Sequence, residues 1–115
     1  MTDAERDEIA ALIAARLAAA EAAEAAARAG GGAATVALDQ QAVGRLSRMD
    51  ALQGQAMARA TATRRRAEIA RLREAARRVS DPEFGECEDC GEPIGLPRLR
   101  AEPTLRLCRD CMGTR

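Results

Sequence analysis

Two short stretches decide the fold of this chain: ECEDC at residues 86–90 and LCRDC at residues 107–111. Each stretch carries two cysteines separated by two residues, so each can present two thiols from one tight turn. The 17 residues between the two pairs allow the second turn to fold back onto the first. Four sulfur ligands in this arrangement suit a tetrahedral Zn²⁺ ion. The sequence therefore predicts one metal site, formed by Cys87, Cys90, Cys108 and Cys111.

The chain contains no histidine, so thiolates alone would hold the metal. A zinc ion with four protein ligands has no open position for water or substrate, and such a site is structural. The metal would instead supply folding free energy, on the order of 10 kcal/mol in comparable finger peptides. We therefore expect one structural zinc and no enzymatic activity.

Two other roles for the cysteines are open. Two disulfides would require an oxidising compartment, but the acidic N-terminal residues 1–5 lack the apolar core of a signal peptide. A thiol oxidoreductase would use one Cys-x-x-Cys pair at the start of a helix after a strand. Here two pairs lie in sequence punctuated by glycine and proline, and a reactive thiol would have to be free of metal.

The composition limits the kind of core that the chain can build. The hydrophobic fraction is 47%, but much of it is alanine, and Phe84 is the single aromatic residue among 115. Helices packed closely through small side chains are therefore expected. The formal net charge is zero, which gives no long-range attraction to nucleic acid. Charged residues interrupt every alanine stretch, so we expect no membrane span and a cytoplasmic protein.

Two long helices are predicted before the cysteines. Thr2 and Glu5 resemble a capping box, and residues 3–29 read as helix until the glycines at 30–32. A second helix should run from residue 38 or 39 to Val79, before the Ser-Asp-Pro stop at residues 80–82. A short link between long helices favours an antiparallel hairpin.

The expected fold is mainly α: a long antiparallel coiled-coil hairpin at residues 1–79, with its tip near 30–42, and a small four-cysteine zinc finger module at 80–115. Across the seam, we expect Ile9, Ile13 and Leu17 to meet Leu52, Met49 and Leu46. Residues 69–79 would extend past the first helix with Ile69, Leu72, Ala76 and Val79. Their partner is either the finger, through residues such as Phe84, Ile94 and Leu99, or another molecule.

The second helix is rich in arginine between residues 59 and 78, where eight arginines accompany Glu68 and Glu74. Such a face is either simply solvated or a contact for an acidic partner or phosphates. Aromatic rings for base stacking are missing there. A zinc-containing nucleic-acid-binding protein and a coiled-coil interaction module both remain as alternative functions.

The sequence around the cysteines resembles the C4 zinc finger of the DksA/TraR family. The resemblance is carried by FGECEDCGEPIG at 84–95, RLRAEPT at 98–104 and LCRDC at 107–111. It implies a bacterial transcription regulator that binds RNA polymerase directly, without sequence-specific DNA binding. In such regulators the hairpin enters the secondary channel of the polymerase, and an acidic residue at its tip approaches the active centre.

The resemblance implies tip residues by position. The family tip carries an Asp followed two residues later by Ala; here Asp39 is followed by Ala42, with Gln41 at the expected alanine position. Asp39 is our first choice for the tip acid, and it could also serve as a helix N-cap. Counting back from the finger favours Asp50 instead.

The family resemblance also concerns the alarmone ppGpp. Arg71 stands where the family has a basic contact to this ligand. Two other basic positions are occupied by Glu102 and Met112. Because a polyphosphate site depends on positive charge, we expect little or no ppGpp dependence.

Overall fold

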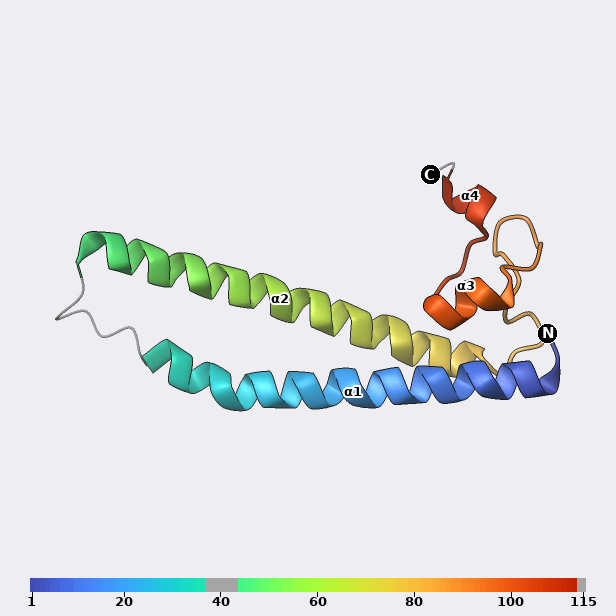
Figure 1. The fold of residues 1–115 in the computed structure, drawn as a ribbon, viewed down its shortest axis with the longest axis horizontal. Coiled ribbons are helices and arrows are strands. Elements are labelled where there is room, and N and C mark those ends of the chain that lie inside the picture. Colours follow the sequence, from blue (N-terminus) through green and yellow to red (C-terminus); the bar gives the residue numbers. More distant parts are fainter. Residues whose placement is uncertain (37–43, 114–115) are drawn as a thin grey trace. The chain divides into compact units, whose positions relative to one another are not determined.

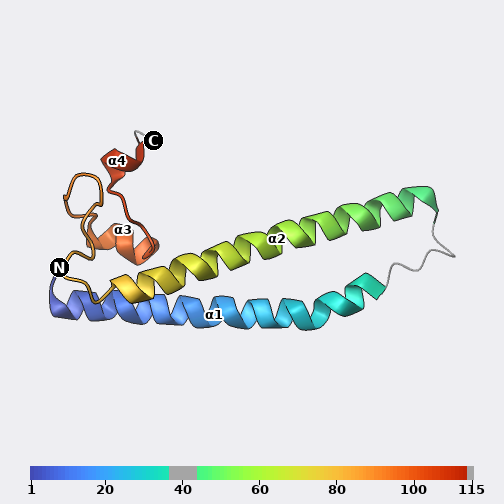
Figure 2. The same cartoon turned by 180° about the vertical axis from the view of Figure 1, so that it is seen from behind.

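The computed structural model describes residues 1–36 and 44–113. Its two long helices are α1 (Asp3–Val36) and α2 (Arg45–Arg78), and two short helices follow, α3 (Leu96–Ala101) and α4 (Arg109–Gly113). Figures 1 and 2 show α1 and α2 running in opposite directions. The predicted class, a mainly helical chain with an antiparallel hairpin and a small cysteine-rich module, is confirmed. No helix in the described ranges is long and apolar enough to cross a membrane.

The start of α1 is the predicted capping box. The backbone N–H of Glu5 donates to Thr2 Oγ1 at 3.1 Å, and the N–H of Thr2 donates to Glu5 Oε1 at 2.8 Å. The backbone N–H of Thr2, followed by its hydroxyl, lowers the pKa of Glu5 below its ordinary value. Two N–H groups that have no partner within the helix are thereby satisfied.

The predicted link between the long helices was wrong at both ends. α1 continues through Gly30 to Val36, and α2 begins at Arg45, directly after Gly44. A helical glycine costs about 1 kcal/mol relative to alanine, whereas proline, which costs about 3 kcal/mol, is absent from this region. The alanines around the glycines have the highest helix propensity. The expected tip residues Asp39 and Ala42 lie outside the described residues.

The chain forms two compact units, each of which contains parts of both long helices. The first unit consists of Met1–Ala18 and Ala70–Arg115, and the second consists of Ala19–Ile69. The finger therefore shares its unit with the beginning of α1 and the end of α2. The expected division into a hairpin at residues 1–79 and a zinc finger module at 80–115 remains a prediction.

The core of the first unit draws on α1, α2 and the finger. Its buried apolar side chains include Ile9, Ile13, Leu72, Ala75, Phe84, Ile94, Leu99 and Pro103. This set contradicts the expected seam: Ile9 and Ile13 lie in one unit, whereas Met49 and Leu52 belong to the other unit and are each 59% exposed. The side chain of Leu46 is not described.

The end of α2 does not extend past α1 as expected, because Arg6 near the start of α1 hydrogen-bonds to the carbonyl of Val79. The finger, which was the expected partner, belongs to the same unit. Leu72 is 1% exposed, and Phe84, Ile94 and Leu99 of the finger are buried. The guanidinium of Arg78 lies 6.0 Å from the centre of the Phe84 ring. Ala76 is exposed and Val79 is half-buried, so the predicted stripe is covered only in part.

Polar contacts join α1 to the end of α2 and to the finger within this unit. Arg6 Nη1 donates to the carbonyl oxygens of Val79, at 2.7 Å, and Asp81, at 2.6 Å. Arg100 donates two hydrogen bonds to the carboxylate of Glu8, at 2.6 and 3.1 Å. The Arg100 guanidinium lowers the pKa of Glu8, and the carboxylate raises the pKa of Arg100. Sequence analysis missed these contacts, because no local pattern pairs residues so far apart.

The second unit has a seam of partly buried side chains around one buried carboxylate. Among residues 51–69 of α2, Ala51, Gln55 and Ala62 are half-buried and Ile69 is buried. Glu24 of α1 is 8% exposed. Its oxygens lie 3.6 Å from Arg65, 3.2 Å from Arg66 and 3.7 Å from Arg28. A carboxylate this buried requires cationic partners, so the cluster fixes which residues of α1 and α2 lie opposite each other.

The observed register predicts unequal effects for two leucines of α2. Leu72→Ala should reduce the free energy of unfolding by about 2–5 kcal/mol, because a buried side chain is replaced by a cavity. Leu52→Ala should change it by less than about 0.5 kcal/mol, because Leu52 is exposed. Chemical denaturation followed by helical circular dichroism measures both values. Equal losses of unfolding free energy in the two variants would instead support the helix contacts expected from sequence.

Glu24→Gln should reduce the free energy of unfolding by about 1–3 kcal/mol, because the half-buried Arg65 loses its charged partner. Asp50→Asn is the matched control, since it neutralises an exposed acid in the same unit and should have almost no effect. The same denaturation experiment applies. An unchanged stability for Glu24→Gln would mean that the cluster does not hold the two helices together.

Candidate metal centre

The first cysteine pair lies in a turn built by short backbone hydrogen bonds. The N–H of Cys87 donates to the carbonyl of Glu92 at 2.8 Å, and the N–H of Gly91 donates to the carbonyl of Cys87 at 2.9 Å. Gly91 has φ +77°, a left-handed conformation that glycine adopts without strain. An isolated bridge joins Glu86 to Pro93 across this turn. The turn brings the thiols of Cys87 and Cys90 to one side.

The second pair lies at the start of α4 and is tied to the first. The N–H of Cys111 points to Cys108 Sγ at 3.5 Å, and the N–H of Glu88 donates to the carbonyl of Arg106 at 2.9 Å. The side chains of Arg106 and Glu88 also form an ion pair at 2.7 Å. Residues on both sides of the 17-residue connection are thus held next to each other.

The four sulfur atoms lie within 4.8 Å of one another. The Sγ atoms of Cys90 and Cys108 are 3.7 Å apart, which is too long for a disulfide bond of about 2.05 Å. A tetrahedron with Zn–S bonds of about 2.3 Å has sulfur–sulfur edges of about 3.8 Å. The donor set therefore fits one four-coordinate zinc ion, and Cys87, Cys90, Cys108 and Cys111 would complete its coordination.

The electrostatics of the site also favour a cation. The backbone N–H of Cys108 contributes most to holding the pKa of Cys87 at about 6, below its ordinary value of 9.0. Hydrogen bonding with the sulfur of Cys108, and then with those of Cys87 and Cys90, raises the pKa of Cys111. Four thiolates this close would repel one another, so the thiols cannot all ionise unaided. A divalent metal neutralises them together.

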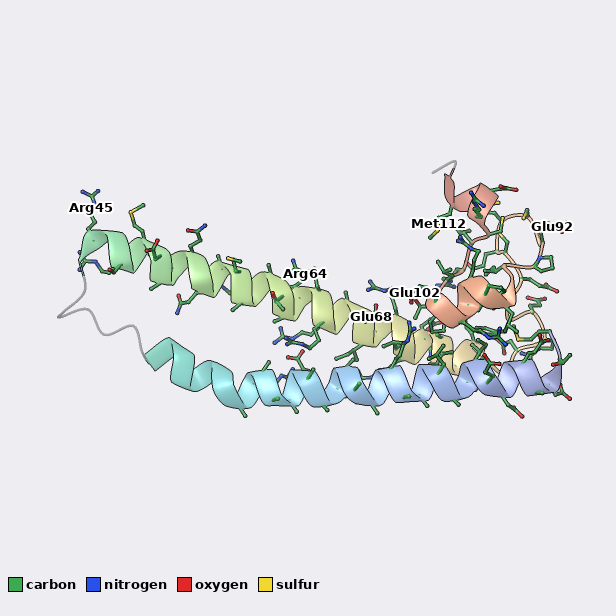
Figure 3. The ribbon with its side chains drawn as sticks, viewed as in Figure 1. Arg45, Arg64, Glu68, Glu92, Glu102 and Met112 are labelled. Carbon is green, nitrogen blue, oxygen red and sulfur yellow. The ribbon has the colours of Figure 1, made fainter. Side chains whose placement is uncertain are left out.

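The remaining predicted site residues are not ligands of this centre. Asp50 is exposed in the second turn of α2, and Arg71 is exposed on the same helix. Glu102 is half-buried, and its carboxylate accepts a hydrogen bond from Thr104 at 2.8 Å. Met112 is exposed on α4, where its sulfur lies 3.6 Å from Arg98 Nη2. Figure 3 labels both Glu102 and Met112. The functions predicted for these residues remain predictions.

Comparison with known proteins identifies the family that the finger matches. Residues 82–114 match the prokaryotic dksA/traR C4-type zinc finger. The chain is 46% identical over 48 residues to the RNA polymerase-binding transcription factor DksA of Escherichia coli K12. The aligned region covers 42% of this chain and 32% of that protein. It is 49% identical over 47 residues to the DksA of Caulobacter vibrioides NA1000, and this alignment covers 41% of this chain and 33% of that protein. The matched region thus spans about a third of each relative.

The fold comparison extends over nearly the whole chain. The solved structure of transcription factor DksA2 from Pseudomonas aeruginosa superimposes with a TM-score of 0.79, covering 99% of this chain and 84% of that one. The sequence identity is 21%, so this likeness establishes the fold alone. The predicted resemblance of the finger is confirmed, and with it the single structural zinc.

Cys90→Ser should remove the zinc, because serine does not replace a thiolate ligand for this metal. Cys90 is exposed, so the loss would reflect ligation rather than packing. Elemental analysis should give one zinc per wild-type chain and almost none for the variant. Glu92→Gln is the control, since it changes an exposed residue of the same turn and should retain zinc. Full zinc content in Cys90→Ser would contradict the four-sulfur site.

Acidification should release the metal, because protons compete with zinc for thiolates. The pKa of Cys87 is lowered to about 6, so its stabilising contribution is complete above its ordinary value and is lost as the pH falls through about 6. We expect zinc to be retained at neutral pH and released progressively on acidification, as measured with a zinc-sensitive dye. Release already at pH 8 would show that these thiolates do not hold it.

Proposed function

We propose that this chain, which carries a C4 zinc finger of the DksA/TraR family at residues 82–114, is a non-enzymatic transcription regulator that binds RNA polymerase. The observation that carries the proposal is the 46–49% identity of the finger region to proteins named RNA polymerase-binding transcription factors. The shared fold supports extending the comparison to the helical hairpin. A regulator of this kind acts in the cytoplasm, where we place the protein.

The hairpin suits a protein that reaches into a narrow channel. Ala51 and Ala62 lie on the α1-facing side of α2, and alanine permits two helices to approach closely. A pair of helices packed through small side chains is thin. We propose that the end of the hairpin, between Val36 and Arg45, enters the secondary channel of RNA polymerase.

We propose Asp39 as the acid that acts in the channel. α1 ends at Val36 and α2 begins at Arg45, so Asp39 and Ala42 belong to the segment that connects the helices. Asp50 lies beyond that segment, within α2. A carboxylate at the tip could act on the catalytic Mg²⁺ or on basic polymerase residues near it. These helix bounds support Asp39 over Asp50.

Zinc has an indirect role in this proposal. A metal with four cysteine ligands offers no coordination site for a reacting group, so its contribution is to the stability of the finger. The finger shares a compact unit with the beginning of α1 and the end of α2. The folded finger would thereby hold the base of the hairpin in place.

The regulator should depend little on ppGpp. Of the three family positions for basic contacts, Arg71 alone is positively charged here, because the other two are Glu102 and Met112. Glu102 would repel a polyphosphate, and its carboxylate already accepts a hydrogen bond from Thr104. We therefore propose regulation without this alarmone.

Co-purification with the RNA polymerase of the host tests the proposal, with open-complex lifetime as the functional measurement. Wild type should bind and change the lifetime. Asp39→Asn should bind with similar affinity but have little effect on the lifetime, because the tip loses its charge. Asp50→Asn is the matched control and should behave as wild type.

Other outcomes of this experiment assign the function elsewhere. Loss of activity in Asp50→Asn but not in Asp39→Asn would make Asp50 the tip acid. Absence of polymerase binding by wild type would restrict the family resemblance to the fold. Binding to DNA or RNA that falls at least about tenfold over a modest rise in salt would instead favour a nucleic-acid-binding protein.

A further inference from the structure

In the second unit, α2 has two apolar faces on opposite sides of the helix. The first is the seam with α1, where Ala51, Gln55, Ala62 and Ile69 recur at helical spacing and are partly or fully buried. The other face, which we call the outer face, carries the polar Gln53 and the apolar residues Met49, Leu52, Ala56, Met57 and Ala60. With 3.6 residues per turn, its centre lies about half a turn from the seam.

The outer face exposes large side chains that nothing in the described residues covers. Met49 and Leu52 are each 59% exposed, and Met57 is 65% exposed. Ala56 and Ala60 between and beyond them are also exposed. Isolated apolar side chains are common on protein surfaces, but several on one face of one helix indicate an interaction site.

The charges around the outer face are strongly one-sided. Residues 45–66 contain six arginines and a single acid, Asp50. Glu24 engages Arg65 and Arg66, and the other four arginines are exposed. Figure 3 shows that Arg45 and Arg64 point from α2 to the side away from α1. The outer face is therefore an apolar strip bordered by positive charge.

We infer that the outer face binds an acidic amphipathic helix of a partner protein, which packs along α2 as a third helix. The partner would place leucine-like side chains against Met49 and Leu52. Its carboxylates would lie near the bordering arginines, among them Arg48 and Arg59. Helix-in-groove recognition of this kind reads apolar residues at positions i, i+3, i+4 and i+7. This inference does not depend on polymerase binding.

Two other occupants fit the surface less well. A second copy of the chain, paired through the same face, would bring arginines against arginines, because Asp50 is the single acid in the segment. A membrane surface is favoured by basic helices with Trp or Phe on their apolar side. The outer face has neither, because the sole aromatic residue of the chain is Phe84.

The test uses the zinc-loaded full chain and two synthetic helical peptides. One peptide has leucines at the a and d positions of three heptads and glutamates at e and g; the other has lysines in place of the glutamates. Fluorescence anisotropy at low salt should show at least about tenfold tighter binding of the glutamate peptide. Added salt should reduce this preference.

Variants of the chain then locate the binding surface. The double variant Met49→Gln/Leu52→Gln should weaken binding of the glutamate peptide by about tenfold or more, because two buried contacts are lost. Met112→Gln is the matched control, since it changes a methionine that is 46% exposed on α4. Arg48→Glu/Arg59→Glu should shift the preference toward the lysine peptide. Helical circular dichroism and zinc content should stay unchanged in all three.

Four results would overturn the inference. The first is equal binding of both peptides, or binding of neither. The second is an affinity that the double variant leaves unchanged. The third is a concentration-dependent dimer, seen by sedimentation, that the double variant abolishes, because the occupant would then be a second copy. The fourth is binding to vesicles of anionic lipid in the absence of peptide binding, which would identify a membrane surface.

Discussion

The close approach of four thiols is the constraint on which the first unit depends. Cys87, Cys90, Cys108 and Cys111 lie within 4.8 Å of one another, although 17 residues separate the two pairs. Without a cation, this arrangement crowds ionisable sulfurs, as the raised pKa of Cys111 indicates. When zinc is bound, its four bonds to sulfur cross-link a module that has few large apolar side chains. The metal thus supplements the small apolar core that Phe84, Ile94 and Leu99 contribute from the finger.

The second unit is held together by a different kind of interaction. Its seam includes Ala51 and Ala62, which allow close packing but give little preference for one register over another. The carboxylate of Glu24 supplies that preference, because a buried charge is tolerated only opposite Arg65 and Arg66. A nonspecific small-residue contact and a specific ionic contact therefore have complementary roles in the hairpin.

The sequence was sufficient to predict the features that depend on local spacing. The zinc ligands, the capping box of Thr2 and Glu5, and the end of α2 near Val79 all follow from patterns within a few residues. The register of the hairpin was predicted wrongly, because Met49 and Leu52 resemble core residues at heptad spacing. Large apolar residues occur on both sides of α2, and sequence periodicity alone does not identify the side that faces α1. Nothing local marked Glu24 as buried, or paired Arg6 with Val79.

The discontinuity of the first unit has a consequence for how the protein is made. Residues 1–18 leave the ribosome early, yet they share their compact unit with residues 70–115. Their apolar positions, including Ile9 and Ile13, stay without their final partners until Cys111 has emerged and the metal is bound. Contacts between segments so distant in sequence are slow to form. The base of the hairpin therefore reaches its final packing only after residues 70–115 have been made and zinc has bound.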